Sequence, residues 1–195
     1  PAPLDPLFAS DAGEDDEDAR RGAGLAGIDG SPYFLYVGTS EPKKNVIEVF
    51  RALQRFREAT PMSRDQRLVL VGPNDKARRR LLGVADRMGM RGLVASVDGL
   101  SDLELRDVYR SADALLHLSW SEGLAWPVLE AQACGTPVVC SDRGALPETA
   151  GGAARVVPAG TDGSAACEAL LQLHGDEEGR ADLVRLGRER VHGLT

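Results

Sequence analysis

The sequence lacks the features that mark membrane, disulfide-rich or zinc-binding proteins. None of its 195 residues falls in a run that approaches the roughly 18 uncharged apolar residues of a membrane-spanning helix. Its only cysteines, Cys134, Cys140 and Cys167, are an odd number and have no C-x-x-C spacing. A disulfide framework or zinc knuckle is therefore not expected, and a reducing, cytoplasmic location fits better. No set of histidine, cysteine and carboxylate residues has metal-ligand spacing.

Charge is distributed very unevenly along the chain. The net charge is −7, but residues 1–30 alone contain eight acidic and two basic residues. The rest of the chain is near neutral and its basic residues are scattered, so we expect no nucleic-acid partner. Residues 1–31 combine prolines, an acidic run and a Gly/Ala stretch, with little apolar surface to offset the entropy cost of ordering. They predict an acidic, flexible interdomain linker.

Three common catalytic or nucleotide-binding motifs are missing or misplaced. The chain has no G-K-[ST] phosphate loop and no G-x-S-x-G nucleophile elbow. G-x-G-x-x-G occurs at 22–27, but it follows an acidic run and no helical pattern follows it. That motif binds a dinucleotide only between a strand and a helix. An NAD-dependent enzyme is therefore not expected.

From Pro32 onward, short apolar runs alternate with helical patterns. The expected strands lie at 33–38, 68–73, 93–97, 114–118, 136–140 and 154–157. The expected helices lie near 45–56, 75–89, 101–111, 126–135, 161–173 and 176–191. The strands are almost continuously apolar, which is typical of a parallel sheet covered by helices on both faces. We predict one α/β domain over 32–195, a Rossmann-like doubly wound parallel sheet of about six strands.

The loop after the first strand offers groups that suit an anion. Residues 38–45 contain two hydroxyls, backbone N–H groups, and Lys43 and Lys44 just before a helix. Positive charge at a helix N-terminus opposes the helix dipole, and a bound phosphate would offset this. The alternative is a solvated lysine pair on a surface loop.

The region after the fourth strand offers two carboxylates. Glu122 lies in a glycine-containing loop, and Glu130 follows eight residues later, about one turn inside the next helix. Both could accept hydrogen bonds from sugar hydroxyls, while free N–H groups of Val128 and Leu129 would receive a diphosphate. The alternative for Glu130 is an ordinary surface glutamate. His117, between two leucines, is expected to be a satisfied core histidine rather than a catalytic base.

Three blocks of sequence resemble the C-terminal, donor-binding domain of GT-B glycosyltransferases of family 4. The block Y-V-G-T-S-E-P-K-K-N (36–45) resembles the family's V-G-x-x-x-P-R-K-N. The block S-E-G-L-A-W-P-V-L-E-A-Q-A-C-G-T-P-V-V (121–139) is similar to E-G-F-G-L-P-x-L-E-A-M-A-x-G-x-P-V-V, with the same spacing between its two glutamates. The block S-D-R-G-A-L-P-E (141–148) resembles the segment that follows.

The resemblance implies roles for these residues in binding a nucleotide diphosphate sugar without a metal or other cofactor. Lys44, with Lys43 beside it, would stabilise the diphosphate as leaving group. Glu122 would hold donor sugar hydroxyls, which makes Lys44 and Glu122 the catalytic candidates, and Glu130 would hold the ribose. The other implied donor-binding residues are Gly38, Thr39, Gly72, Gly99, Leu100, Leu103, Gly123, Leu124, Ala125, Val128 and Leu129.

The sequence departs from the family pattern at several of these positions. Thr39 stands where members often have arginine. Lys43 replaces another arginine, so bidentate phosphate recognition gives way to a point charge. Ala125 adds a Cβ where the family often has glycine, which limits close approach of a sugar, and Trp126 would reshape the acceptor side.

The implied function is transfer of a hexose, mannose-like, to an unknown acceptor with retention of configuration. Enzymes of this class place the active site between two Rossmann-like domains, and no acceptor-binding domain is recognisable here. We therefore expect this chain alone to bind nucleotide without turnover, and expect membrane contact only through the other domain. The alternatives are a non-catalytic Rossmann-like binding module, or another GT-B enzyme such as a sugar-nucleotide epimerase.

Overall fold

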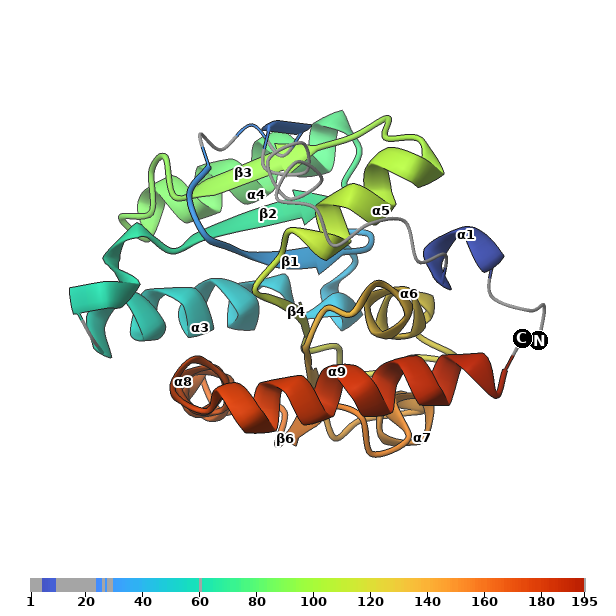
Figure 1. Cartoon of the computed structure of the whole chain (residues 1–195). Helices are drawn as coiled ribbons and strands as arrows, with labels where there is room; N and C mark the ends of the chain where they lie inside the picture. Colours follow the sequence, from blue (N-terminus) through green and yellow to red (C-terminus); the bar gives the residue numbers. More distant parts are fainter. Residues whose placement is uncertain (1–4, 10–23, 26, 28–29, 60, 195) are drawn as a thin grey trace.

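A six-stranded parallel sheet forms the centre of the molecule (Figure 1). The computed structural model describes residues 5–9, 24–25, 27, 30–59 and 61–194. The strands are β1 (Tyr33–Val37), β2 (Arg67–Val71), β3 (Val94–Val97), β4 (Ala114–His117), β5 (Val138–Ser141) and β6 (Arg155–Val157). Their order is β3-β2-β1-β4-β5-β6, so the direction of winding reverses between β1 and β4. The predicted Rossmann-like, doubly wound sheet is confirmed.

Helices cover both faces of this sheet. One face carries α3 (Val46–Ala59), α4 (Asp75–Arg87) and α8 (Ser164–Gly175). The other carries α5 (Asp102–Arg110), α6 (Trp126–Cys134) and α7 (Leu146–Ala150). The long helix α9 (Glu177–His192) packs on both α6 and α8 (Figure 1). Short 3₁₀ turns, η1 (Pro42–Lys44) and η2 (Pro61–Asp65), flank α3. No described helix has the length and apolar character needed to cross a membrane.

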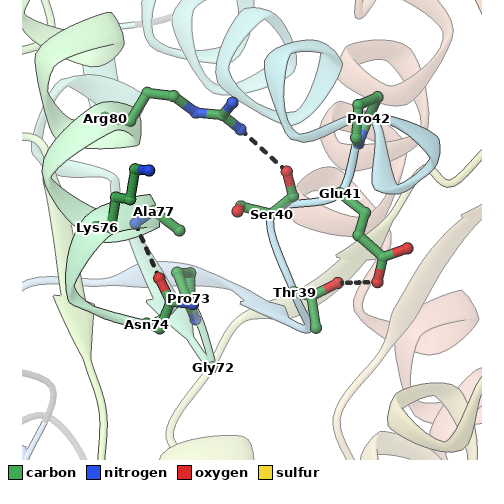
Figure 2. A pocket seen from close by; sticks show the side chains of 10 residues that line it. All are labelled: Thr39, Ser40, Glu41, Pro42, Gly72, Pro73, Asn74, Lys76, Ala77 and Arg80. Carbon is green, nitrogen blue, oxygen red and sulfur yellow. Dashed lines mark hydrogen bonds between the residues drawn. The ribbon is translucent and has the colours of Figure 1, made fainter.

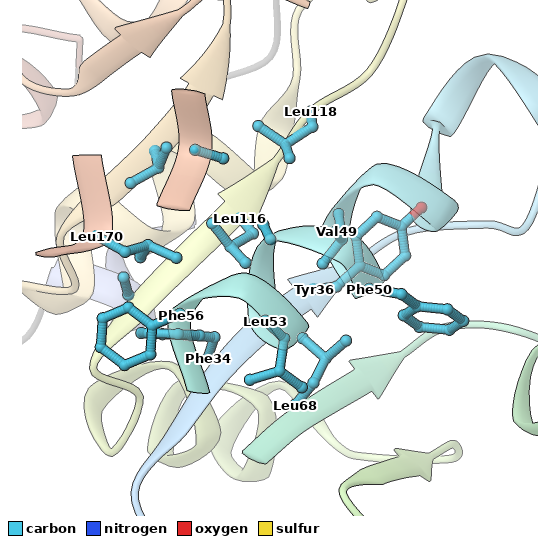
Figure 3. Close-up of a cluster of buried hydrophobic side chains, with 14 of the residues drawn as sticks. Phe34, Tyr36, Val49, Phe50, Leu53, Phe56, Leu68, Leu116, Leu118 and Leu170 are labelled. Carbon is cyan, nitrogen blue, oxygen red and sulfur yellow. The ribbon is translucent and has the colours of Figure 1, made fainter. Parts of the chain in front are cut away.

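Alternate residues along β1 to β5 supply two separate apolar cores. On one face Phe34 and Leu116 pack against α3 and α8, with the rings of Phe34 and Phe56 edge to face at 4.9 Å (Figure 3). On the other face Leu35 and Leu115 pack against α5 and α6. Because side chains alternate across a strand, a strand buried on both sides must be continuously apolar. This is the pattern from which the sheet was predicted.

Several element ends follow the expected local chemistry. Ser101 and Glu104 form a capping box at the start of α5, with the Ser101 N–H donating to Glu104 Oε2 at 2.8 Å. Gly135 ends α6 in the left-handed conformation, at φ 76°. Helix α7 was not predicted; it has five residues, too few for a periodic apolar pattern to show in the sequence.

The N-terminal segment contributes one anchor that its composition did not indicate. In α1 (Pro6–Ala9), the Phe8 side chain is buried and its ring lies edge to face with that of Tyr109, at 6.2 Å. Burial of one such ring stabilises a fold by about 2 kcal/mol. The linker assignment for residues 1–31 stays a prediction. The acidic run at 14–18 and half of the glycine-rich motif at 22–27 lie outside the described residues.

We predict that Gly72, directly after β2, tolerates no side chain. Its φ is +104°, and a Cβ there would lie 2.9 Å from the carbonyl oxygen of Gly38 in the neighbouring loop. Gly89 provides the matched control, since its φ is +75° but a Cβ would meet nothing within 4 Å. In urea denaturation, Gly72→Ala should lower the free energy of unfolding by about 2–4 kcal/mol and Gly89→Ala by about 1 kcal/mol. Equal losses of unfolding free energy in the two variants would contradict the close packing of Gly72 against Gly38.

Candidate functional site

The loops after β1 and β4 are tied together at the carboxyl edge of the sheet. The backbone N–H of Trp120 donates to the carbonyl of Lys43 at 2.7 Å. The side-chain amide of Asn45 donates to the carbonyl of Leu118 at 3.1 Å. These bonds fix the residues on either side of Lys44, so its side chain has a defined starting position. The site thus lies at the point where winding reverses, the usual ligand position in such sheets.

Between these ties, Lys44 and Glu122 form a largely buried ion pair. Lys44 Nζ lies 2.7 Å from Glu122 Oε1 and 2.9 Å from Oε2. Only 16% of the lysine side chain and 9% of the glutamate side chain are exposed. The structure therefore brings the two catalytic candidates together, and the solvated-lysine alternative is wrong for Lys44. Lys43, by contrast, is exposed and pairs with Glu41 at 3.2 Å.

His117 is a third member of this cluster, and sequence reasoning missed it. It is the last residue of β4 rather than an interior one, and its fully buried ring places Nε2 2.9 Å from Glu122 Oε1. The prediction of a core histidine is correct for its burial. The expectation that its polar atoms are hydrogen-bonded is only half correct, because Nδ1 has no hydrogen-bond partner among the described residues. The feature that could have identified His117 as a site residue is its position at the carboxyl end of a strand.

The environment of Glu122 keeps its carboxylate ionised. Burial alone would raise the pKa of Glu122, but hydrogen bonds from His117 and Lys44 outweigh it and lower the pKa to about 2. The carboxylate is therefore a permanent anion near neutral pH.

The backbone of Glu122 is held by the segment that follows β5. The N–H of Ala145 donates to the Glu122 carbonyl at 3.2 Å. Gly144, at φ +58°, packs so closely that a Cβ would lie 2.8 Å from the Glu122 nitrogen. The Ser141 hydroxyl donates to the Ser119 carbonyl at 2.5 Å. This explains physically why the block at 141–148 accompanies the glutamate block: it braces the loop that carries Glu122.

Glu130 occupies a separate position on α6. Its Oε2 accepts a hydrogen bond from the Tyr109 hydroxyl at 2.7 Å, and the side chain is partly buried. Burial raises the pKa of Glu130, which the Tyr109 hydroxyl partly offsets and Asp102 reinforces. The surface-glutamate alternative is therefore wrong. That Glu130 shares one ligand with Glu122 stays a prediction.

The start of α6 differs in one respect from expectation. The Val128 N–H donates to the Ala125 carbonyl at 2.9 Å, so the prediction that it is a free donor is wrong. The Val128 N–H is instead bonded within a tight turn at the first residues of α6. Ala125 itself adopts the left-handed conformation, with φ 55°. That conformation favours glycine, which accounts for the glycine in the family pattern at this position.

A pocket of about 480 Å³ opens between the loops after β1 and β2, and neither Lys44 nor Glu122 is among the residues that line it (Figure 2). Two predicted donor-binding residues, Thr39 and Gly72, line it, together with Lys76 and Arg80 of α4. The Arg80 guanidinium donates to the Ser40 carbonyl at 3.1 Å across the mouth. Because the carboxylate of Glu41 also lines the pocket, its charged residues are two cations and one anion, a small excess of positive charge at this edge of the sheet.

The remaining predicted residues lie in the loops of the same edge or in the helices that follow those loops. Gly38 N–H donates to the Val71 carbonyl at 2.9 Å, and the Leu124 carbonyl accepts from the Thr149 hydroxyl at 2.8 Å. Leu103 is 52% exposed at the start of α5, whereas Leu100 packs partly against the core. Gly99, Gly123 and Leu129 have no described contact that tests their predicted roles. Within the described ranges no group of three potential metal ligands occurs, and all three cysteines are buried and free.

The fold is that of one Rossmann-like domain of GT-B glycosyltransferases. Residues 24–190 match the family described as glycosyl transferases group 1, so the chain belongs to this family. It is 32% identical over 144 residues to O-antigen chain mannosyltransferase B of Escherichia coli, covering 74% of this chain and 37% of that protein. It is 36% identical over 135 residues to D-inositol 3-phosphate glycosyltransferase of Actinosynnema mirum, covering 67% and 32%. The chain thus spans about a third of these relatives.

Solved structures agree on the architecture. The structure of WaaG, a glycosyltransferase involved in lipopolysaccharide biosynthesis, superposes with a TM-score of 0.80 at 21% identity, over 98% of this chain and 50% of that one. That of Anabaena HepE in complex with UDP and glucose superposes with a TM-score of 0.78 at 17% identity, over 96% and 50%. At these identities the likeness establishes the fold alone.

We predict that the Lys44–Glu122 ion pair makes the free energy of unfolding depend on pH in the acidic range. A carboxylate with a lowered folded-state pKa stabilises the fold above its unfolded value near 4.5, and this contribution is lost as pH falls toward about 2. The stability advantage of the wild type over Glu122→Gln should therefore shrink by about 1–2 kcal/mol between pH 5 and pH 3, as urea denaturation would measure. An advantage that stays constant over this range would show that the pair leaves Glu122 unperturbed.

Proposed function

We propose that this chain is the donor-binding, C-terminal domain of a retaining glycosyltransferase of family 4, which moves a hexose from a nucleotide diphosphate sugar to an acceptor. One observation carries the proposal. Lys44 and Glu122, 78 residues apart in sequence, meet at 2.7 Å where the winding of the sheet reverses. A fixed cation and a fixed anion at one point suit a ligand with a charged diphosphate joined to a hydroxyl-rich sugar.

Each member of the pair suits one half of such a donor. The Lys44 ammonium would leave Glu122 for the diphosphate, whose negative charge grows as the glycosidic bond breaks. The ionised Glu122 carboxylate accepts hydrogen bonds but donates none, so it suits sugar hydroxyls. Low exposure strengthens both interactions, because little water competes for them.

The nucleoside would extend from this point toward α5 and α6. Glu130 would bind the ribose hydroxyls, and the exposed Leu103 offers an apolar surface for the base. A mannose-like sugar is supported by relatives named as mannosyltransferases. A nucleoside diphosphate is supported by neighbours whose structures contain UDP or UDP-glucose. We further propose that the reaction needs no metal and takes place in the cytoplasm.

We expect the chain to bind nucleoside diphosphates through Lys44. Calorimetry with GDP, UDP, dTDP and ADP should reveal one preferred nucleotide, and Lys44→Met should weaken its binding by roughly 10-fold to 100-fold, the effect of losing a charge-assisted hydrogen bond. Arg91→Met is the control, because it removes an equal charge from an 85% exposed side chain before β3, at the opposite edge of the sheet. Equal loss in both variants would indicate nonspecific charge attraction. No binding by the wild type would refute the proposal.

We also expect that this chain alone transfers no sugar, because the proposed active site requires a second domain for the acceptor. Incubation with the preferred sugar nucleotide and candidate acceptors should release no more nucleoside diphosphate than Glu122→Ala does. Release above that control would show that the chain is catalytically complete.

A further inference from the structure

We propose that His117 is the positioning residue that keeps the Glu122 carboxylate oriented toward the donor sugar when Lys44 moves to the diphosphate. The inference rests on the proposed function and concerns the same site. In the described part of the chain, the Glu122 carboxylate is hydrogen-bonded to Lys44 and His117, and the proposed chemistry takes the lysine away. The question is therefore what holds the carboxylate afterwards.

The geometry makes His117 the remaining partner. Glu122 Oε1 is shared by Lys44 at 2.7 Å and His117 Nε2 at 2.9 Å, whereas Oε2 is hydrogen-bonded, among the described residues, to Lys44 alone, at 2.9 Å. A carboxylate can only accept hydrogen bonds, so Nε2 must carry the proton of the imidazole. If Lys44 turns to a diphosphate, Oε1 stays bonded to His117 and Oε2 becomes free to accept a sugar hydroxyl.

The surroundings of His117 fit a fixed orienting role. Its side chain is completely buried at the end of β4, so its position is set by the sheet rather than by a mobile loop. The Glu122 loop is itself braced through Ala145 and Gly144. A histidine retained only for packing needs no polar neighbour. This one instead leaves Nδ1 without a described partner while Nε2 bonds the carboxylate, a cost that an apolar residue would avoid.

The test compares ligands with and without the sugar. Calorimetry would measure binding of GDP and GDP-mannose, and of UDP and UDP-glucose, and use the pair whose diphosphate binds the wild type. His117→Leu removes the donor at Nε2, whereas His117→Gln places an amide N–H near the same position. The expected result is that His117→Leu lowers the affinity ratio of sugar nucleotide to nucleoside diphosphate by roughly 3-fold to 10-fold, while His117→Gln largely restores it.

Three further measurements separate this role from a packing role. Thermal unfolding shows whether each variant folds. If His117→Leu does not fold, His117→Asn replaces it, because the shorter asparagine amide does not reach the position of Nε2. In a Glu122→Ala background, loss of His117 should leave the ratio unchanged, because nothing remains to be positioned. The inference is overturned if Glu122→Ala lowers the ratio but neither His117→Leu nor His117→Asn does. Absence of any nucleotide binding by the wild type would instead refute the proposed function on which it rests.

Discussion

The ion pair between Lys44 and Glu122 is the constraint on which the site depends. Two opposite charges, each mostly removed from water, are costly unless they stay paired and hydrogen-bonded. The pair can form only if the loops after β1 and β4 hold their places, and Trp120 and Asn45 supply the ties that hold them. The electrostatics of the site therefore depend on the topology of the sheet, because β1 and β4 are neighbouring parallel strands and so place these two loops side by side at one edge.

The bracing of Glu122 shows how a rigid scaffold serves a loop residue. Gly144 approaches the Glu122 backbone so closely that only a glycine fits, and Ala145 bonds its carbonyl. A loop held in this way loses little further entropy when it binds a ligand, so less of the binding energy is spent on ordering it. The three sequence blocks are thus one physical unit: one carries the cation, one the carboxylate, and one fixes the carboxylate.

The sequence predicts the sheet well, and it predicts that Lys44 and Glu122 lie in loops at one edge of that sheet, although it does not predict their ion pair. Continuous apolar runs determine a doubly covered parallel sheet almost without tertiary information, and the topology then brings the strand ends together. Contacts that depend on side-chain direction were not accessible. The role of His117 was not predicted because a shift of one residue in the strand boundary decides whether it lies inside the strand or at its end. The burial of Phe8 was not predicted because a single aromatic ring in an acidic segment gives no periodic apolar pattern. The bonded Val128 N–H depends on a turn that only coordinates reveal.

Glu122 and Glu130 illustrate how environment separates the pKa values of chemically identical groups. Glu122, hydrogen-bonded to a lysine and an imidazole, has its pKa lowered to about 2, whereas burial raises the pKa of Glu130 despite the hydrogen bond from Tyr109. A diphosphate placed between two ionised carboxylates would meet repulsion from both sides. Here Lys44 compensates the charge of Glu122, and burial makes Glu130 ionise less readily. The asymmetry therefore favours an anionic ligand at the Lys44 side and a neutral, hydroxyl-bearing group at the Glu130 side.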